Sequence, residues 1–139
     1  MKNILLIDDD LSLCMLLEQI LSKQYRVSSC NSAMDALCWL VEGNFPSLII
    51  TDIIMPSLTG IELVEKIRES GMLSGIPIII LSGLDDTELR KKCVELGVNS
   101  FLHKPFTPDL LIETIARVLN ANSNGVNTEE QNNKSKSYA

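Results

Sequence analysis

The stretch that decides the fold is Leu48-Ile49-Ile50-Thr51-Asp52-Ile53-Ile54-Met55-Pro56. Its apolar start predicts a buried strand that ends near Asp52, where the chain should pass into a loop. A carboxylate at the end of a buried strand costs free energy unless a nearby group compensates for its charge. The fold must therefore bring a suitable group from elsewhere in the sequence to Asp52.

Four other short apolar runs have a similar length. The five predicted strands span residues 3–7, 25–29, 47–51, 76–81 and 98–102. Three of them are almost continuously apolar, as in parallel strands covered on both faces, whereas residues 25–29 alternate and predict an edge strand. A helical pattern follows each strand. This alternation predicts an α/β fold with a doubly wound, five-stranded parallel sheet.

The helical segments begin with capping patterns. We expect N-caps at Ser32, Thr59, Asp85 and Thr107. Thr59 and Glu62 have the spacing of a capping box, in which each side chain bonds the backbone of the other residue. The helix between Asp85 and Glu95 has a thin apolar face. We therefore expect this helix to be held loosely.

Length and composition indicate one domain with a polar end. The chain has 139 residues, of which 45% are hydrophobic and 22% are charged, and these are ordinary values for a single globular domain. We expect the domain to span residues 1–120 and residues 121–139 to form a disordered polar tail or a linker. The net charge of −6 argues against direct nucleic-acid binding by this domain.

The cysteines and the apolar runs bear on the location of the protein. The cysteines at positions 14, 30, 38 and 93 lack the spacing of a metal site, and we expect buried, reduced thiols rather than disulfides. No apolar run is long enough to span a bilayer, so we expect no membrane partner. These features predict a cytoplasmic protein.

Polar groups follow the other predicted strands. Asp8 and Asp9 follow the first strand, Ser82 follows the fourth and Lys104 follows the fifth. In doubly wound sheets, ligands bind at the carboxyl ends of the strands. We therefore expect these four side chains to lie around Asp52.

Three carboxylates gathered at one edge need a compensating charge. Two carboxylates about 4 Å apart repel by roughly 4 kcal/mol at an effective dielectric constant near 20. Hard carboxylate oxygens suit Mg²⁺, whose coordination is commonly completed by water and phosphate oxygens. Capping of the first helix is the alternative role for Asp9 and Asp10, and we assign it to Asp10. The sequence therefore predicts a magnesium site formed by Asp8, Asp9 and Asp52.

Asp52 is the candidate nucleophile. A carboxylate can accept a phosphoryl group when the incoming negative charge is neutralised, and Lys104 and Mg²⁺ would supply positive charge. Ser82 can donate a hydrogen bond to a phosphoryl oxygen, and Gly83 leaves room for the group. Taken singly, Ser82 is a turn hydroxyl and Lys104 a surface amine. Together with the acids, they predict a phosphoryl-transfer site.

As a set, these motifs resemble the receiver domains of bacterial two-component response regulators. The matching stretches are Ile4-Leu5-Leu6-Ile7-Asp8-Asp9, Asp52-Ile53-Ile54-Met55-Pro56, Thr59-Gly60, Ile80-Leu81-Ser82-Gly83 and His103-Lys104-Pro105-Phe106. The resemblance covers about residues 2–120 and implies a flavodoxin-like (βα)5 fold with the strand order 2-1-3-4-5. It also implies a signalling phosphoacceptor in a phosphorelay rather than an enzyme.

The resemblance assigns roles to the residues of the pocket. It implies that Asp52 accepts phosphate from a phosphohistidine of a sensor histidine kinase or of a phosphotransfer protein. Mg²⁺ would be held by Asp8, Asp9, Asp52 and the backbone carbonyl of Ile54. Lys104 would bridge to the phosphoryl group.

The resemblance also implies a switch. Ser82 and Phe101 would form the switch pair, although Phe101 is alternatively a plain core residue. The Lys104–Pro105 bond would be cis, and the turn would aim the lysine. The output would be a shift of the face made by the helix at 85–95, the strand at 98–102 and the last helix. The output partner is left open, and so is a homodimer.

The residues two positions beyond Asp52 and Ser82 are Ile54 and Leu84. Both side chains are apolar, and neither can orient an attacking water. We therefore expect slow hydrolysis of the phosphoryl group.

Two alternative functions are open at the level of the sequence. Asp8 and Asp10 also resemble the first motif of haloacid-dehalogenase-like phosphatases, in which Asp8 would be the nucleophile and Asp10 the acid/base. The other alternative is a receiver-like interaction module that works without phosphorylation. Replacing Asp52 with asparagine distinguishes the first alternative, because a receiver would lose phosphoryl labelling and a phosphatase would not.

Overall fold

Five parallel strands alternate with five helices in the part of the chain that the computed structural model describes, residues 1–124. The elements are β1 (Asn3–Ile7), α1 (Leu11–Leu21), β2 (Arg26–Cys30), α2 (Ala33–Val41), β3 (Leu48–Asp52), α3 (Gly60–Glu69), β4 (Ile78–Ser82), α4 (Thr87–Glu95), β5 (Ser100–His103) and α5 (Pro108–Asn124). The strands form one sheet in the order β2-β1-β3-β4-β5. The predicted fold class and strand order are both confirmed.

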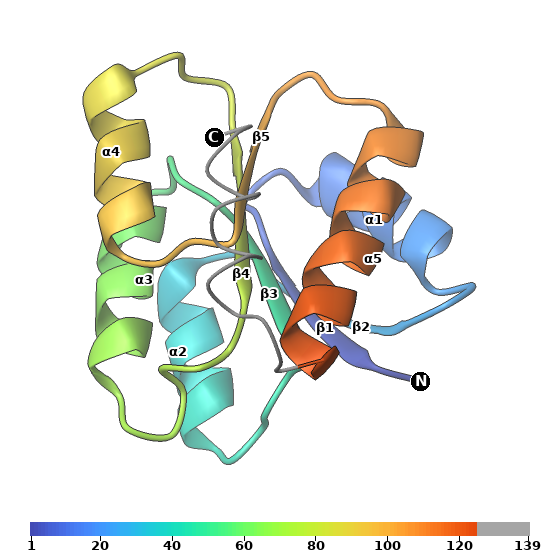
Figure 1. Ribbon diagram of the computed structural model, residues 1–139, viewed down its shortest axis with the longest axis horizontal. Coiled ribbons are helices and arrows are strands. Elements are labelled where there is room, and N and C mark those ends of the chain that lie inside the picture. The colour runs from blue at the N-terminus through green and yellow to red at the C-terminus, as the bar shows by residue number, and fades with distance from the viewer. Residues whose placement is uncertain (125–139) are drawn as a thin grey trace.

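Helices cover both faces of the sheet, with α1 and α5 on one face and α2, α3 and α4 on the other (Figure 1). Alternate residues of each strand enter the two cores. In β1, Leu5 and Ile7 face the layer of α2, α3 and α4, whereas Ile4 and Leu6 face α1 and α5. Burial on both faces explains why the central strands are continuously apolar.

Four of the five strands begin later than predicted. In β4 the reason is Pro77, which has no N–H to donate to the ladder, so the strand starts at Ile78. At the other end, backbone pairing extends past the apolar runs: Asp52 pairs with Leu81, and Ser82 pairs with His103. Asp52 and Ser82 are thus the last residues of β3 and β4, and the ladder fixes their backbones.

Side-chain caps start the helices locally. The Asp10 carboxylate accepts a hydrogen bond from the Leu13 N–H at 3.1 Å, which confirms its predicted role as the N-cap of α1. Thr59 and Glu62 form the predicted capping box at the start of α3, with bonds of 3.2 and 3.1 Å. Ser32 and Thr107 also accept hydrogen bonds from the helices that follow them.

The predicted cap of α4 is wrong by one residue. The carboxylate of Asp86, not that of Asp85, accepts hydrogen bonds from the N–H groups of Glu88 and Leu89 at 3.0 and 3.2 Å. An N-cap side chain accepts from the second and third residues of the helix, and because α4 begins at Thr87 these are Glu88 and Leu89, two and three positions after Asp86. The thin apolar face is confirmed, because Cys93 is the only fully buried residue of α4.

The cysteines differ from one another in burial. Cys14 and Cys93 are buried as predicted, but Cys30 is only half-buried and Cys38 is exposed. Three residues of α2 face the sheet, Ala33, Ala36 and Leu40. Cys38 lies on the opposite side of the helix, so the prediction of a buried thiol is wrong there.

The last helix extends beyond the predicted domain boundary. α5 runs to Asn124, past the boundary expected at residue 120. The rest of the predicted polar tail, residues 125–139, lies outside the described residues. Among residues 1–124, no helix has the length and the apolar character needed to cross a membrane.

Candidate functional site

The carboxyl edge of the sheet assembles the candidate site from four strands. Asp8 directly follows β1, Asp52 ends β3, Ser82 ends β4, and Lys104 directly follows β5. The register of the parallel ladders aligns these ends, because Ile7 pairs with Thr51 and Asp52 with Leu81. Residues that are far apart in sequence therefore meet at one edge.

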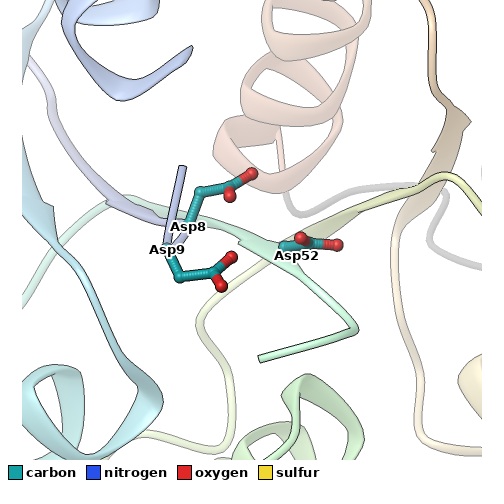
Figure 2. Close-up of side chains that lie close together, drawn as sticks. All are labelled: Asp8, Asp9 and Asp52. Carbon is teal, nitrogen blue, oxygen red and sulfur yellow. The ribbon is translucent and has the colours of Figure 1, made fainter. Parts of the chain in front are cut away.

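Asp8, Asp9 and Asp52 form an acidic pocket. Each offers a carboxylate oxygen, and these oxygens lie within 4.8 Å of one another. Figure 2 shows the three side chains close together where the chain leaves β1 and β3. Asp8 and Asp52 are buried, with 0% and 8% of their surface exposed, whereas Asp9 is exposed. The pocket is thus open to solvent on the side of Asp9.

Backbone N–H groups orient the two buried carboxylates. The Oδ1 of Asp8 accepts a hydrogen bond from the N–H of Asp10 at 2.9 Å. The Oδ1 of Asp52 accepts one from the N–H of Ile53 at 2.7 Å and a longer one from Ile54 at 3.4 Å. The Oδ2 atoms of both carboxylates are left to face the amine of Lys104.

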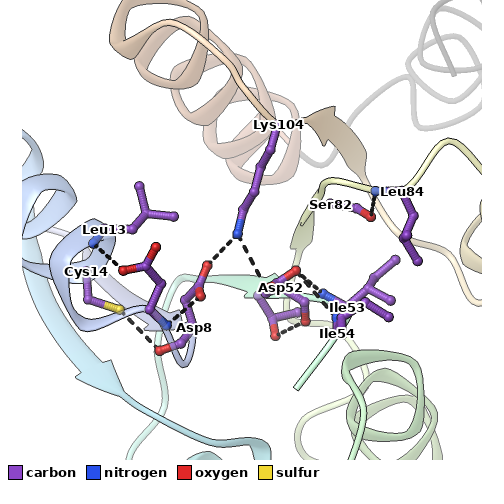
Figure 3. A network of polar contacts seen from close by, with 11 residues as sticks. Asp8, Leu13, Cys14, Asp52, Ile53, Ile54, Ser82, Leu84 and Lys104 are labelled. Carbon is purple, nitrogen blue, oxygen red and sulfur yellow. Dashed lines mark hydrogen bonds and ion pairs between the residues drawn. The ribbon is translucent and has the colours of Figure 1, made fainter. Parts of the chain in front are cut away.

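Lys104 bridges the two buried acids (Figure 3). Its Nζ lies 2.9 Å from the Oδ2 of Asp8 and 3.3 Å from the Oδ2 of Asp52. The Lys104–Pro105 peptide bond is cis, and the N–H of Lys104 donates to the carbonyl of Ser82 at 2.7 Å. Burial lowers the pKa of Lys104, but the hydrogen bond to Asp8 and the negative charge of Asp52 outweigh burial and raise the pKa above its ordinary value.

The acids are not fully compensated by one amine. Burial raises the pKa of Asp52 above its ordinary value; Lys104 lowers that pKa, and the charge of Asp8 raises it further. A group whose ionised form is disfavoured in spite of an adjacent ammonium has room for more positive charge. Three converging hard oxygen donors with one open side fit Mg²⁺, so the residues present match the predicted metal.

Two residues that support the pocket were missed from the sequence. A Cβ atom at Gly60 would lie 2.1 Å from the carbonyl oxygen of Asp52, so the start of α3 can approach β3 only with glycine at this position. The Thr59-Gly60 pair could be recognised as a motif in the sequence, but the close approach that requires the glycine could not. The thiol of Cys14 donates to the carbonyl of Asp8 at 3.4 Å. Burial, and then the charge of Asp8, raise the pKa of Cys14 to about 11.

Ser82 and Gly83 lie beside the acids. Ser82 is fully buried, and its Oγ accepts a hydrogen bond from the N–H of Leu84 at 3.0 Å rather than contacting Asp52 or Lys104 (Figure 3). A Cβ atom at Gly83 would meet no atom within 4 Å. Open space is therefore present beside Ser82, and it does not depend on glycine.

The other residues named from the sequence lie around this centre. Phe101 is half-buried against the core, and the guanidinium carbon of Arg90 lies 4.8 Å from the centre of its ring. Ile54 and Leu84 are apolar and exposed, with 56% and 42% of their surface accessible. His103 is exposed at the end of β5.

Fold and pocket together define a class: doubly wound α/β domains with an acidic pocket at the carboxyl edge of the sheet. The chain belongs to the response regulator receiver domain family, which matches it over residues 4–116. The resemblance seen in the sequence motifs is thereby confirmed. A receiver domain is a signalling module of two-component systems and not a member of a classical enzyme family.

Relatives with known names agree with this assignment. The chain is 39% identical over 98 residues to the two-component response regulator ORR5 of Oryza sativa subsp. japonica, a match that covers 70% of this chain and 73% of that protein. It is 32% identical over 117 residues to hybrid signal transduction histidine kinase D of Dictyostelium discoideum, which covers 84% of this chain but 7% of that protein.

Solved structures show the same fold. The CheY-like response regulator receiver domain protein from Methanospirillum hungatei JF-1 matches with a TM-score of 0.84 and 28% identity, over 90% of this chain and 98% of the other. The BeF3-activated DrrB receiver domain matches with a TM-score of 0.75 and 26% identity, over 86% and 98%.

The phosphatase alternative receives no support from these matches. Its acid/base would be Asp10, but the carboxylate of Asp10 caps α1 by accepting a hydrogen bond from Leu13.

Receiver domains typically bind Mg²⁺ at the acidic pocket and work with histidine kinases or phosphotransfer proteins.

Proposed function

We propose that Asp52 accepts a phosphoryl group from a phosphohistidine of a sensor histidine kinase or of a phosphotransfer protein. The observation that carries this proposal is the position of the Lys104 Nζ between the carboxylates of Asp8 and Asp52, at 2.9 and 3.3 Å. Of these two acids, Asp52 is the one that an incoming phosphoryl group would meet. Asp9 leaves the pocket open on the solvent side.

The transfer requires charge neutralisation more than covalent activation. Asp8, Asp9, Asp52 and the carbonyl of Ile54 would hold Mg²⁺, which when bound neutralises negative charge on the phosphoryl oxygens. A carboxylate oxygen of Asp52 forms the new P–O bond, and the P–N bond to the donor imidazole breaks, with its electron pair left on the ring nitrogen. Lys104 then pairs with a phosphoryl oxygen in place of its contact with Asp52.

The signal would arise from the new acceptors that the phosphoryl group brings. Ser82 would exchange its hydrogen bond with Leu84 for one that it donates to a phosphoryl oxygen. Movement of Ser82 would shift α4 and, with it, the contact between Arg90 of α4 and Phe101. The face made by α4, β5 and α5 would change as a result.

The phosphoryl group should be lost slowly. Ile54 and Leu84 present apolar, exposed side chains beside Asp52 and Ser82, and neither can orient a water molecule for attack. Replacing Leu84 with glutamine is expected to speed the loss, because an amide can hold water. A phosphorylated wild-type protein that decays within seconds, as followed by intact mass, would contradict this part of the proposal.

The cytoplasm is the proposed location. The four cysteines of the chain all lie within residues 1–124 and are free thiols. Free thiols persist in reducing compartments.

The decisive experiment is labelling with a small phosphodonor. Purified protein incubated with acetyl phosphate and Mg²⁺ should gain the mass of one phosphoryl group. Asp52→Asn should abolish this gain, whereas Asp85→Asn, which removes an exposed acid outside the pocket, should leave it intact. Labelling that persists in Asp52→Asn would refute the proposed acceptor. If the wild-type protein gains no phosphoryl group from acetyl phosphate and does not respond to beryllofluoride, the phosphorylation-independent module would be favoured.

A further inference from the structure

Arg68, in the last turn of α3, holds two separate segments through their backbone carbonyls. Its Nε donates to the carbonyl of Leu96 at 2.8 Å, and its Nη2 donates to that of Gly97 at 3.0 Å. Its Nη1 donates to the carbonyls of Ser74 and Ile76 at 2.9 and 2.8 Å. The guanidinium thus joins the end of α4 to the segment that leads into β4. We call these four hydrogen bonds the guanidinium clamp.

The C-terminal end of α4 is also fixed by its own backbone. Gly97 has a φ of 72°. Its N–H donates to the carbonyl of Val94, and the N–H of Val98 donates to the carbonyl of Cys93, both at 3.0 Å. This pair of bonds is a Schellman motif. Cys93 has only 1% of its surface exposed, so the C-terminal end has a cap, a buried side chain and the guanidinium clamp.

The N-terminal end of α4 and the loop before it have no comparable anchor. Residues 83–88 are all exposed. In the described part of the chain, their hydrogen bonds stay local: the Asp86 carboxylate caps its own helix, and the N–H of Leu84 donates to the Oγ of Ser82. Ser82 is therefore the point at which this loop is tied to the pocket.

We propose that α4 pivots about its C-terminal end, with Arg68 as the fixed point, when Ser82 changes its hydrogen bond. This inference rests on the proposed function, which supplies the change at Ser82. α4 has nine residues, and at about 1.5 Å per residue it forms a lever about 13 Å long. A rotation that leaves Gly97 in place moves residues 84–88 furthest. The Arg90–Phe101 contact lies between the two ends and moves less.

Amide hydrogen exchange resolved by residue can test the pivot in the full 139-residue chain. The protein would be compared in Mg²⁺ with and without beryllofluoride. The pivot predicts that beryllofluoride changes exchange at residues 84–90 at least about tenfold more than at residues 97–99, because protection follows local opening.

Variants separate the two ends of the helix. Arg68→Lys keeps the charge but cannot span four carbonyls, so amides 97–99 should exchange about tenfold faster, with labelling of Asp52 retained. Gly97→Ala should act similarly, because it strains the positive φ; its Cβ would lie 3.7 Å from the Arg68 Nε, an ordinary van der Waals distance that leaves the four hydrogen bonds in place. Asp86→Ala should speed exchange only near the N-terminal end. Lys66→Ala, on the same last turn of α3, is the matched control and should change neither end.

The outcomes distinguish the pivot from the proposed function. A beryllofluoride response spread evenly over residues 84–99 overturns the pivot, and so does unchanged exchange at 97–99 in Arg68→Lys. A wild-type protein that does not respond to beryllofluoride overturns the proposed function, and with it the signalling role of the pivot. A response confined to residues 84–90, together with faster exchange at 97–99 in Arg68→Lys, supports the pivot.

Discussion

Lys104 and Arg68 are two cations at opposite edges of the sheet, with opposite kinds of partner. Lys104 follows β5, and its ammonium contacts the carboxylates of Asp8 and Asp52. Arg68 contacts neutral carbonyls of segments that precede β4 and β5. Burial alone would lower the pKa of both groups. At Lys104 the carboxylates outweigh burial and the pKa is raised, whereas at Arg68 burial prevails and the pKa is lowered.

The chemistry of the two cations indicates which edge can exchange its contacts. An ammonium is a compact charge with three rotatable donors, and it can pass from a carboxylate to a phosphoryl oxygen. A guanidinium is a rigid, planar group, and at Arg68 it donates hydrogen bonds to four backbone carbonyls, which are uncharged. Under the proposed function, Lys104 would act in the chemistry at one edge, and Arg68 would provide fixed support at the other.

The largest expected effect is that of Lys104→Met on phosphoryl labelling. Methionine fills much of the same space but removes the charge that faces the incoming group. Labelling of Asp52 by acetyl phosphate should slow about 100-fold or more, as measured by intact mass against time. Arg68→Lys is the control at the opposite edge and should label at nearly the wild-type rate. Equal losses in the two variants would remove the distinction between the edges.

Arg68→Met should have the largest effect on stability. It leaves four carbonyls without their donor, and we expect the free energy of unfolding to fall by about 2–4 kcal/mol. Urea unfolding followed by circular dichroism measures this loss. Lys66→Met, exposed on the same helix, should stay within about 0.5 kcal/mol of wild type. A small loss at Arg68 would show that the guanidinium clamp contributes little.

Gly60→Ala tests the contact between α3 and β3 at the chemical edge. The added Cβ would meet the Asp52 carbonyl at 2.1 Å, so backbone must shift, at a cost of about 1–3 kcal/mol. Thermal unfolding should show the loss, and labelling should slow as well because Asp52 is displaced. Gly71→Ala is the control, since its Cβ would meet no atom within 4 Å. Normal stability and labelling in Gly60→Ala would argue against the tight approach.

The smallest effect expected is that of Asp52→Asn on stability without Mg²⁺. The raised pKa of Asp52 means that ionising this carboxyl group costs more free energy in the folded protein than in the unfolded chain. The stability that the protonated group contributes is therefore lost as the pH rises from the ordinary pKa of 3.8 through the raised pKa. Asparagine should therefore raise the melting temperature at pH 7, and the difference should shrink in acid. Mg²⁺ at 100 times its dissociation constant should stabilise the wild type by about 2.7 kcal/mol and the variant less. A variant less stable than wild type at pH 7 would contradict this reasoning.

Much of the site could be predicted because parallel strands place their carboxyl ends at one edge. Asp8, Asp52 and Lys104 were recognised from their positions after apolar runs, although Lys104 and Asp8 are separated by 96 residues in the sequence. The support of the pocket by Gly60 was not predicted. Its reason is a backbone approach between two elements, and no local pattern records such a distance.

The elements, their order along the chain and the caps of Asp10 and Thr59 could be read from the sequence alone, because these depend on periodicity and on hydrogen bonds a few residues long. The packed fold was needed to show which side of α2 Cys38 occupies, which N–H group donates to the Ser82 hydroxyl, and that Arg68 reaches Leu96 and Gly97. Those contacts depend on how helices are rotated and packed on the sheet. Packing is a property of all the elements together, so no single stretch of residues contains it.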